Sequence, residues 1–484
     1  MTGSINPVYL VLGAPLLAAA LLALVPGRFQ IMAGKLNALA SLVTLAAGCS
    51  LFFLRPAATH LIFIDDFNIY LVVLTTFVGF TTSVFSAGYI RHELETGRLD
   101  AAKLRFYHAM YQAFIFTMLL ALVANNLGVM WVAVEGATLT TALMISLYRT
   151  RESIEAAWKY FILCGVGIAL ALFGTILMYL AAQPVMGGGM EAMAWASIIH
   201  QAGRFDPALL NLAFVFLLVG YGTKVGLAPL HAWLPDAHAE GPTPISAVLS
   251  GLLLNVALYA VLRFKMLLAA NHAALAPGPM MVTMGLSSLL LASFMLYRRR
   301  DIKRLFAYSS IEHMGIITFA FGMGGPLANF AGLLHMTMHS LAKSGIFFAV
   351  GHIAQVKETQ RIGDIRGLTA THPTLGWGFL IGVVAIAGLP PLGIFMSEFL
   401  VVTSTMARIP WLALPLVLGL LVSFGALILR LQGVAFGAPS PQPHKRVDAS
   451  LAPLWAHMLL VLIAGLHLPG PLVYWFENVA RLLG

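Results

Sequence analysis

Long apolar runs recur along the whole chain, and no other feature of the sequence restricts the fold as strongly. A run of about 18 or more mostly apolar residues is typical of a membrane-spanning helix. Within lipid only a helix satisfies every backbone hydrogen bond over one such span, so we predict an all-α polytopic membrane protein. We place about fourteen transmembrane helices at residues 7–25, 36–54, 67–90, 110–125, 127–147, 158–182, 208–227, 243–265, 279–297, 302–323, 328–355, 375–404, 411–432 and 453–470.

The composition excludes several classes of function. Of the 484 residues only 10% are charged, against roughly 25% in soluble domains. The net charge of +9 does not indicate a nucleic-acid partner, because the charges lie in short loops between apolar runs. The two cysteines, Cys49 and Cys164, cannot build a disulfide framework or an iron–sulfur site. His231 and His238 match no zinc-binding spacing, so we expect no metal here.

The basic residues are shared unevenly between the predicted loops. Twenty lysines and arginines, including Arg28, Lys445 and Arg446, follow odd-numbered spans, whereas five follow even-numbered spans: Arg55, Arg204, Arg263, Lys265 and Arg408. Lysine and arginine concentrate in cytoplasmic loops of membrane proteins. We therefore expect both termini on the non-cytoplasmic side. The first apolar run has no basic region before it, so we expect no cleavable signal peptide.

Two of the predicted spans contain prolines and glycines that interrupt a helix. One interruption covers residues 224–236 in the seventh span, and the other covers residues 387–393 in the twelfth. Such breaks are tolerated in a membrane where they are buried in protein or line a wet cavity. Paired broken helices at corresponding positions predict an internal repeat and a central transport site.

Few ionisable side chains lie within the predicted spans. A charge at the bilayer centre costs roughly 2.5–3.5 kcal/mol on insertion scales, so each needs a partner, a wet cavity or a neutral state. The spans hold Glu135, Lys224, Glu312, His313, His335, His339, Lys343 and Glu398. We expect the linker after the seventh span to carry His231, Asp236, His238 and Glu240.

His335, His339 and Lys343 follow one another at steps of four residues. This spacing places them on one helical face, each about 6 Å above the last. Histidine exchanges protons near neutral pH, and a buried lysine can do so as well. The face therefore predicts a file of proton-exchanging groups. In the alternative, the two histidines only bind neighbouring helices and the lysine alone takes part.

Glu135 and Lys224 have opposite charge and lie two spans apart. If they meet, each stabilises the charged form of the other, and breaking the contact favours release of the lysine's proton. We interpret them as a switch, with a static ion pair as the alternative. For Glu398 the alternative to proton transfer is a carboxylic acid held neutral. For Glu312 it is an ion pair with a basic residue at 303 or 304.

Four segments together resemble the antiporter-like membrane subunits shared by respiratory complex I, membrane-bound hydrogenases and multisubunit cation/proton antiporters. They are residues 224–247, 301–310, 335–343 and 388–398, and the resemblance covers spans four to thirteen. Within this family the segment 310–315 and the chain length are most similar to the hydrogenase-4 component F branch.

The resemblance implies two inverted five-helix repeats formed by spans 4–8 and 9–13. We accordingly divide the chain into an N-terminal three-helix segment at 1–107, repeats at 108–270 and 271–435, and a C-terminal helix at 436–484. Some family members carry a long lateral helix after the last span. We expect that helix to be absent here or supplied by a partner.

The resemblance also implies roles for the buried residues. Glu135 and Lys224 become the key pair, Lys343 the central carrier and Glu398 the outer-end group, with the histidines connecting them. Relatives often carry a lysine or histidine in span eight, whereas this chain has Asn255, with Ser250 about one turn earlier. The link between the two lysines then relies on water or on Glu312.

We therefore expect a proton-translocating subunit in a bacterial inner membrane, assembled with other membrane subunits and moving protons or sodium. The chain has no redox or catalytic site of its own, so a NiFe centre, iron–sulfur clusters or quinone would belong to partners in an oxidoreductase complex. Three alternatives remain: a sodium or potassium/proton antiporter, an ion-driven energising subunit for inorganic-carbon uptake, and a structural scaffold.

Overall fold

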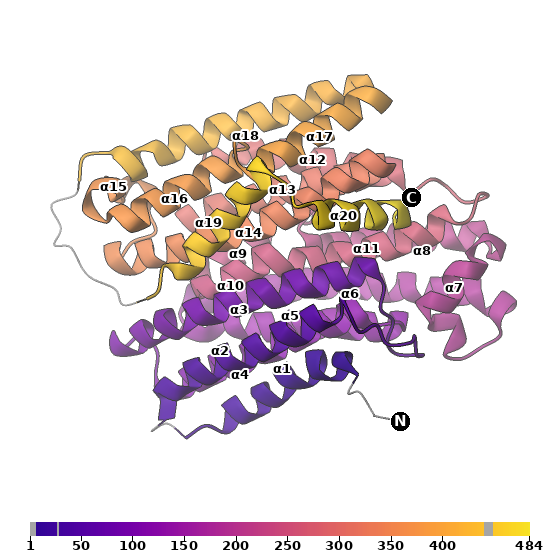
Figure 1. Cartoon of the computed structure of the whole chain (residues 1–484), viewed down its shortest axis with the longest axis horizontal. Coiled ribbons are helices and arrows are strands. Elements are labelled where there is room, and N and C mark those ends of the chain that lie inside the picture. Colours follow the sequence, from indigo (N-terminus) through magenta and orange to yellow (C-terminus); the bar gives the residue numbers. More distant parts are fainter. Residues whose placement is uncertain (1–5, 27–28, 440–448) are drawn as a thin grey trace.

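The computed structural model describes residues 6–26, 29–439 and 449–484. Arg28, Lys445 and Arg446, which the orientation prediction includes, lie outside them. The described residues form helices and a few isolated β-bridges but no strand, which confirms the all-α fold. The long helices lie roughly side by side along the longest axis of the molecule (Figure 1).

The first half of the chain contains eleven α-helices and a π-helical turn, η5, among the described residues. They are α1 (Pro7–Leu24), α2 (Gln30–Ser50), α3 (Asp66–Glu95), α4 (Ala101–Val123), α5 (Leu127–Ile145), α6 (Arg151–Met186), α7 (Trp195–Gln201), α8 (Pro207–Val225), α9 (Leu234–Glu240), α10 (Thr243–Val248), η5 (Leu249–Leu253) and α11 (Leu254–Ala269).

The second half follows with nine α-helices in its described part. They are α12 (Gly278–Leu296), α13 (Ile302–Met323), α14 (Pro326–Lys357), α15 (Leu368–Thr371), α16 (Pro373–Ile386), α17 (Gly393–Arg408), α18 (Pro410–Phe436), α19 (Ala452–Leu466) and α20 (Gly470–Leu482).

Every predicted span overlaps a helix of the structure. By length and apolar composition, ten helices of the described residues could cross a membrane, or eleven if α19 and α20, bent by 81°, form one span. The other three predicted spans correspond to α13 and α14, which carry buried charges, and to the broken pair α16–α17. The count of fourteen and the two inverted repeats stay predictions.

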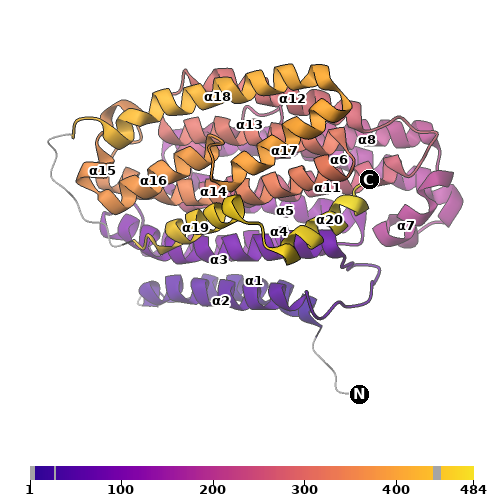
Figure 2. The same ribbon diagram turned by 45° about the horizontal axis from the view of Figure 1, so that its top comes forward.

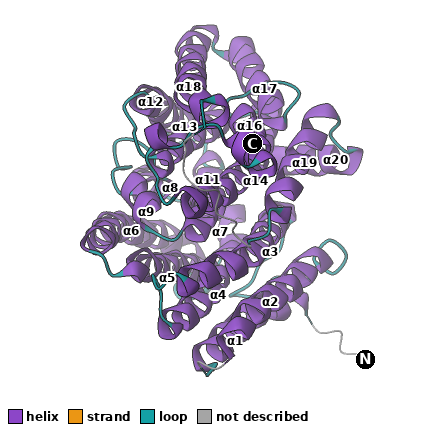
Figure 3. Ribbon diagram, turned by 90° about the vertical axis from the view of Figure 1, so that its left-hand side faces the viewer, coloured by secondary structure: helices purple, strands orange, loops and turns teal. Residues whose placement is uncertain are grey.

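The most buried helices lie at the centre of the bundle. Viewed from one end, α11, α13 and α14 lie inside, whereas α1, α2 and α18 lie towards the edges (Figure 3). The α1–α2 pair forms its own layer beside α3 (Figure 2). The most apolar stretch of residues 243–269 is entirely buried. The outer helices instead expose large apolar side chains, such as Leu414 and Leu421 of α18, as a lipid-facing surface requires.

Polar side chains fix where several helices begin. Asp65 accepts a hydrogen bond from the backbone N–H of Asn68 at 2.9 Å and caps α3. Asp301 caps α13 in the same way through the N–H of Arg304 at 2.9 Å. These caps satisfy backbone donors that have no partner within the helix.

Both predicted breaks are present, and each starts at a glycine in the left-handed conformation. Gly226 has φ 81° directly after α8, and Gly388 has φ 69° between α16 and α17. Glycine adopts this conformation without the steric cost that a Cβ imposes. The prediction of a linker after the seventh span is wrong in one respect, because residues 234–240 form the helix α9. The leucine, alanine and proline residues there pack into the core and stabilise this extra turn.

Two basic residues expected in a loop are instead buried in α11. Arg263 binds Asp65 with two nitrogens, at 2.7 and 2.8 Å, and aromatic rings such as Trp195 and Tyr259 surround it. Lys265 donates to the carbonyl oxygen of Leu483 at 2.9 Å. These partners satisfy the charges inside protein, so the helix continues past the point where the apolar run ends.

Candidate functional site

Lys224 lies in the last turn of α8, directly before the first break, and is buried. Its ammonium donates hydrogen bonds to the hydroxyl oxygens of Thr138 and Tyr160, both at 2.6 Å. The Tyr160 ring in turn packs against Trp233 at 4.9 Å between centroids. A buried lysine is therefore held by neutral hydroxyl groups at the break itself.

Glu135 lies on α5, one helical turn before Thr138. It is half-buried, and its Oε2 atom lacks a hydrogen-bond partner. Among the described residues no ion pair joins Glu135 to Lys224, so the direct contact that a static pair requires is absent. The Thr138 hydroxyl that accepts from Lys224 lies about one turn after Glu135 on the same helix.

The predicted file on α14 faces α13. His335, His339 and Lys343 are each 0% exposed. The Lys343 ammonium donates to the carbonyl oxygen of Phe306 at 2.9 Å. The His339 ring lies 5.5 Å from the ring of His313, and neither of its nitrogens has a hydrogen-bond partner.

His313 joins this file to the second break. Its Nδ1 lies 2.9 Å from Nε2 of His335, and its Nε2 lies 3.1 Å from the carbonyl oxygen of Ile386, the last residue of α16. His335 continues the chain, with its Nδ1 2.9 Å from Oγ of Ser397 on α17. Two histidines thus connect α13, α14 and both helices that flank the break.

Glu398 stands next to this pair, with a carboxylate oxygen within 4.8 Å of ligand atoms of His313 and His335. Nitrogen and carboxylate ligands of this kind could hold a metal ion. However, two nitrogens on one tetrahedral metal would lie roughly 3.3 Å apart, whereas these lie 2.9 Å apart, at hydrogen-bond distance. Each also contacts another polar group, so the geometry favours a hydrogen-bonded proton file.

Glu312 is buried and pairs with neither predicted cation. Lys303 donates to backbone carbonyls at the end of α9, and Arg304 pairs with Asp236 and Glu240 at 3.4 and 3.3 Å. The cytoplasmic-side ion pair considered for Glu312 is therefore wrong. Its Oε2 atom has no hydrogen-bond partner inside the bundle.

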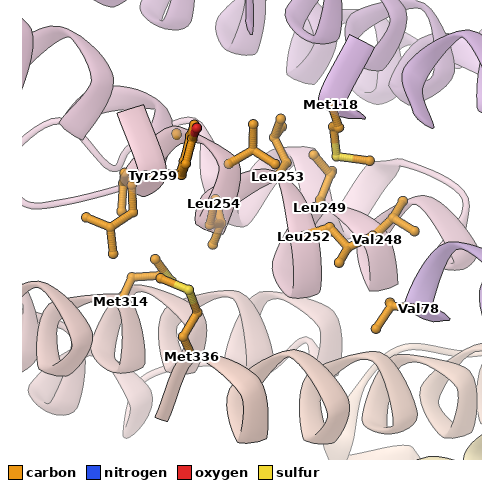
Figure 4. Close-up of a cluster of buried hydrophobic side chains, with 14 of the residues drawn as sticks. Val78, Met118, Val248, Leu249, Leu252, Leu253, Leu254, Tyr259, Met314 and Met336 are labelled. Carbon is orange, nitrogen blue, oxygen red and sulfur yellow. The ribbon is translucent and has the colours of Figure 1, made fainter. Parts of the chain in front are cut away.

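The stretch between the two lysines is mostly apolar but holds two polar contacts. Asn255 donates to Oγ of Ser340 on α14 at 2.7 Å, and the hydroxyls of Ser250 and Ser310 lie 2.7 Å apart. Ser250 belongs to η5, the π-helical turn that interrupts the eighth span. Leucines at 249 and 252–254 and the methionines of neighbouring helices surround this region (Figure 4).

Comparison with known proteins identifies the chain. Residues 124–423 match the family of NADH:quinone oxidoreductase/Mrp antiporter transmembrane proteins. This chain belongs to that family. It is 59% identical to a hydrogenase-4 component F homolog of Methylacidiphilum infernorum over 93% of this chain and 94% of that protein. It is 27% identical to NADH-quinone oxidoreductase subunit N of Desulforudis audaxviator over 82% and 77% of the two chains.

Solved structures share the fold of this chain. A chain of the membrane-bound sulfane sulfur reductase, an archaeal respiratory membrane complex, matches with a TM-score of 0.87 at 19% identity, over 99% of this chain and 98% of that one. A chain of respiratory complex I from Thermus thermophilus matches with a TM-score of 0.81 at 23% identity, over 99% and 100%. The resemblance to the antiporter-like subunits is thus confirmed.

In this chain, three residues predicted for the pathway lie near the first break. Asp236 lies on α9 and pairs with Lys159 at 2.5 Å. It therefore belongs to the cluster of ion pairs that also contains Arg304 and Glu240. His238, on the same helix, is buried and stacks on Phe347 at 4.9 Å. His231 is partly exposed and packs its ring edge near Tyr308 at 6.2 Å.

Sequence reasoning missed two buried ionisable side chains of this chain. It noted His313 as ionisable but gave it no role, because its link to His335 is tertiary and leaves no spacing in the sequence. It also treated Glu93, at the end of α3, as outside the spans. The structure buries Glu93 completely, with Gln355 donating to Oε1 at 2.8 Å and Arg98 3.6 Å from Oε2. The run of apolar residues ends shortly before Glu93, which hid its burial.

Proposed function

We propose that this chain is the proton-translocating, antiporter-like subunit of a membrane complex related to hydrogenase-4 or complex I. The single observation that carries the proposal is the buried file at the second break. It contains a buried lysine and carboxylate, two buried histidines in contact and a partly buried second carboxylate: Lys343, Glu312, His313, His335 and Glu398. Buried ionisable groups are costly in a membrane protein and mark ion pathways.

The geometry of the histidine pair supports stepwise proton transfer. A neutral imidazole accepts a proton on one nitrogen and releases one from the other. The Ile386 carbonyl can only accept, so Nε2 of His313 carries a proton and Nδ1 faces Nε2 of His335. A proton therefore enters His313 at Nε2 while the contact with Ile386 is open, and passes from Nδ1 across the 2.9 Å contact to His335. From there the Ser397 hydroxyl and the neighbouring carboxylate of Glu398 lead towards the surface of the chain. The break in the helix provides the backbone freedom through which this outlet opens and closes.

The first break would hold the control group. Lys224 keeps its proton while Thr138 and Tyr160 accept its hydrogen bonds. Glu135 is half-exposed on the side of α5, so a neighbouring membrane subunit can change its charge environment. Drawing Glu135 towards or away from Lys224 then changes how readily the lysine releases its proton. The proposal assigns redox chemistry and its cofactors to the partner subunits.

The two halves would be the predicted repeats at 108–270 and 271–435. Transfer between them crosses the Asn255–Ser340 contact, where water and hydroxyl groups must relay the proton because neither side chain titrates. Glu93, with its exposed neighbour Arg98, offers access from the cytoplasmic side in the proposed orientation. In this orientation both termini lie on the non-cytoplasmic side of a bacterial inner membrane.

Substitution of Lys224 by methionine tests the proposal. The assembled complex is placed in proteoliposomes, and proton movement is followed with a pH-sensitive dye while the partner enzyme turns over. Lys265→Met is the matched control, because Lys265 is also buried but binds a backbone carbonyl away from the file. We expect Lys224→Met to abolish coupled proton movement in an assembled complex and Lys265→Met to retain it.

Two outcomes count against the proposal. Proton movement by Lys224→Met at the wild-type rate would show that the lysine carries no essential step. Proton flux that requires sodium would favour the antiporter alternative, so the assay is run in sodium-free potassium buffer and again with sodium added.

A further inference from the structure

An arginine-lined cavity lies at the end of α18, away from the buried file. Its volume is about 760 Å³, and its walls come from the α12–α13 turn, the loop after α14 and the last turns of α18. In Figure 1 this is the left-hand end of α18, near α15. Four arginines contribute to the lining: Arg300, Arg361, Arg366 and Arg430.

The arginines of this cavity outnumber its acidic side chains, since Asp364 is the only acidic residue in the described lining. Among the residues that the structure describes, none of the four arginines forms an ion pair, although Asp364 also lines the cavity. Arg430 uses one nitrogen to bind the carbonyl oxygen of Arg299 at 2.5 Å, while its buried Nε has no partner. Arg366 donates from Nε to the carbonyl oxygen of Gly363 at 3.2 Å. A guanidinium carries five N–H donors, so donors of the four arginines remain for an anion.

Backbone contacts hold two walls of the cavity together. The N–H of Ile302 donates to the carbonyl oxygen of Gln360 at 2.9 Å, and the N–H of Ile362 donates to that of Arg300 at 2.8 Å. These bonds place Arg300 beside Arg361 before any ligand arrives. A preformed cluster of this kind loses little conformational entropy when it binds an anion.

An apolar surface continues from the cavity along the outside of the bundle. Leu421, Leu429 and Phe436 of α18 are 62, 62 and 61% exposed. Their spacing of eight and seven residues places them on one stripe of the helix. Trp377 of α16 is 48% exposed and contacts the Phe436 ring edge to face, with centroids 6.2 Å apart. A ligand here meets cationic donors at one end and a lipid-facing apolar stripe at the other.

We propose that this cavity binds the headgroup of an anionic phospholipid whose acyl chains lie along α18. Basic pockets at the membrane surface recognise phosphate-bearing headgroups. The arginines match the phosphate in charge and hydrogen bonding. The exposed stripe distinguishes a lipid from a free phosphate, because a soluble anion gains nothing from it.

Lipid titration of the purified full-length chain tests this site. Native mass spectrometry measures the dissociation constants of phosphatidylglycerol and phosphatidylcholine with identical acyl chains, and of glycerol phosphate as the headgroup alone. The variant is the double substitution Arg361→Gln with Arg430→Gln. The matched control replaces two exposed arginines elsewhere, Arg151→Gln with Arg204→Gln.

Each basic residue near a membrane surface contributes about five-fold in affinity for an anionic lipid. We therefore expect the double variant to weaken phosphatidylglycerol binding about 25-fold and to leave phosphatidylcholine binding and the control unchanged. Equal affinity for the two lipids, or an equal loss in the control, would overturn the proposal. So would glycerol phosphate binding as tightly as phosphatidylglycerol. Unchanged phosphatidylglycerol binding by the double variant would overturn it as well.

Discussion

The buried ion pair between Asp65 and Arg263 allows a sharp stability prediction. The side chains are 17% and 3% exposed and share two short contacts. Asp65→Asn keeps the helix cap, because asparagine caps as well as aspartate, but leaves a buried guanidinium without its counter-ion. Such a loss costs about 3–5 kcal/mol. The neighbouring Asp66 pairs with Arg55 at 2.7 Å, with side chains 23% and 45% exposed, so Asp66→Asn should cost less than about 1 kcal/mol.

Denaturant titration of the purified chain in lipid bicelles measures both changes as shifts in the free energy of unfolding. A third variant, Asp65→Asn with Arg263→Met, removes both charges and packs a flexible apolar side chain among the aromatic rings. It should recover at least half of the lost stability, since no unpaired charge remains. If Asp65→Asn costs no more than Asp66→Asn, or if the double variant is as unstable as Asp65→Asn, the reasoning about the buried charge is refuted.

Three further predictions concern the file, the helix contacts and the orientation. His313→Gln should lower proton flux by about 100-fold, because it removes the titratable ring on α13 that contacts His335. His457 is equally buried, on α19, and contacts the Leu341 carbonyl of α14. His457→Gln should therefore retain flux in the same proteoliposome assay. Gly251→Ala should destabilise the chain by about 1–3 kcal/mol, because a Cβ there would overlap Oγ of Ser344 and lie 3.1 Å from the Ser340 carbonyl oxygen. Gly165 lies inside α6 with open space around it, so Gly165→Ala should stabilise the chain by about 0.5–1 kcal/mol in the bicelle titration. A periplasmic phosphatase fused to the C-terminus should be active, whereas activity only of a cytoplasmic reporter would reverse the orientation.

The residues that sequence reasoning places correctly are those whose relation is local. The file on α14 follows from steps of four residues, since helical periodicity alone sets that face. The two breaks follow from glycines and prolines within apolar runs. These features need no knowledge of how distant segments pack.

Relations between distant segments are what the sequence does not reveal. His313 is connected to its file by a side-chain contact between two helices. Arg263 and Lys265 were expected in a loop, because the length of an apolar run says nothing about partners supplied by Asp65 or a distant carbonyl. Glu93 is buried for the same reason, since Gln355 reaches it from α14.

The most direct test of the central claim is the proton translocation of a Lys343→Met variant in an assembled complex. Lys343 is fully buried on the same face of α14 as His335 and His339, so the account routes the proton through its ammonium. We predict normal subunit composition by copurification and no translocation above the background leak of empty vesicles. Translocation at the wild-type rate in an intact Lys343→Met complex would contradict the account.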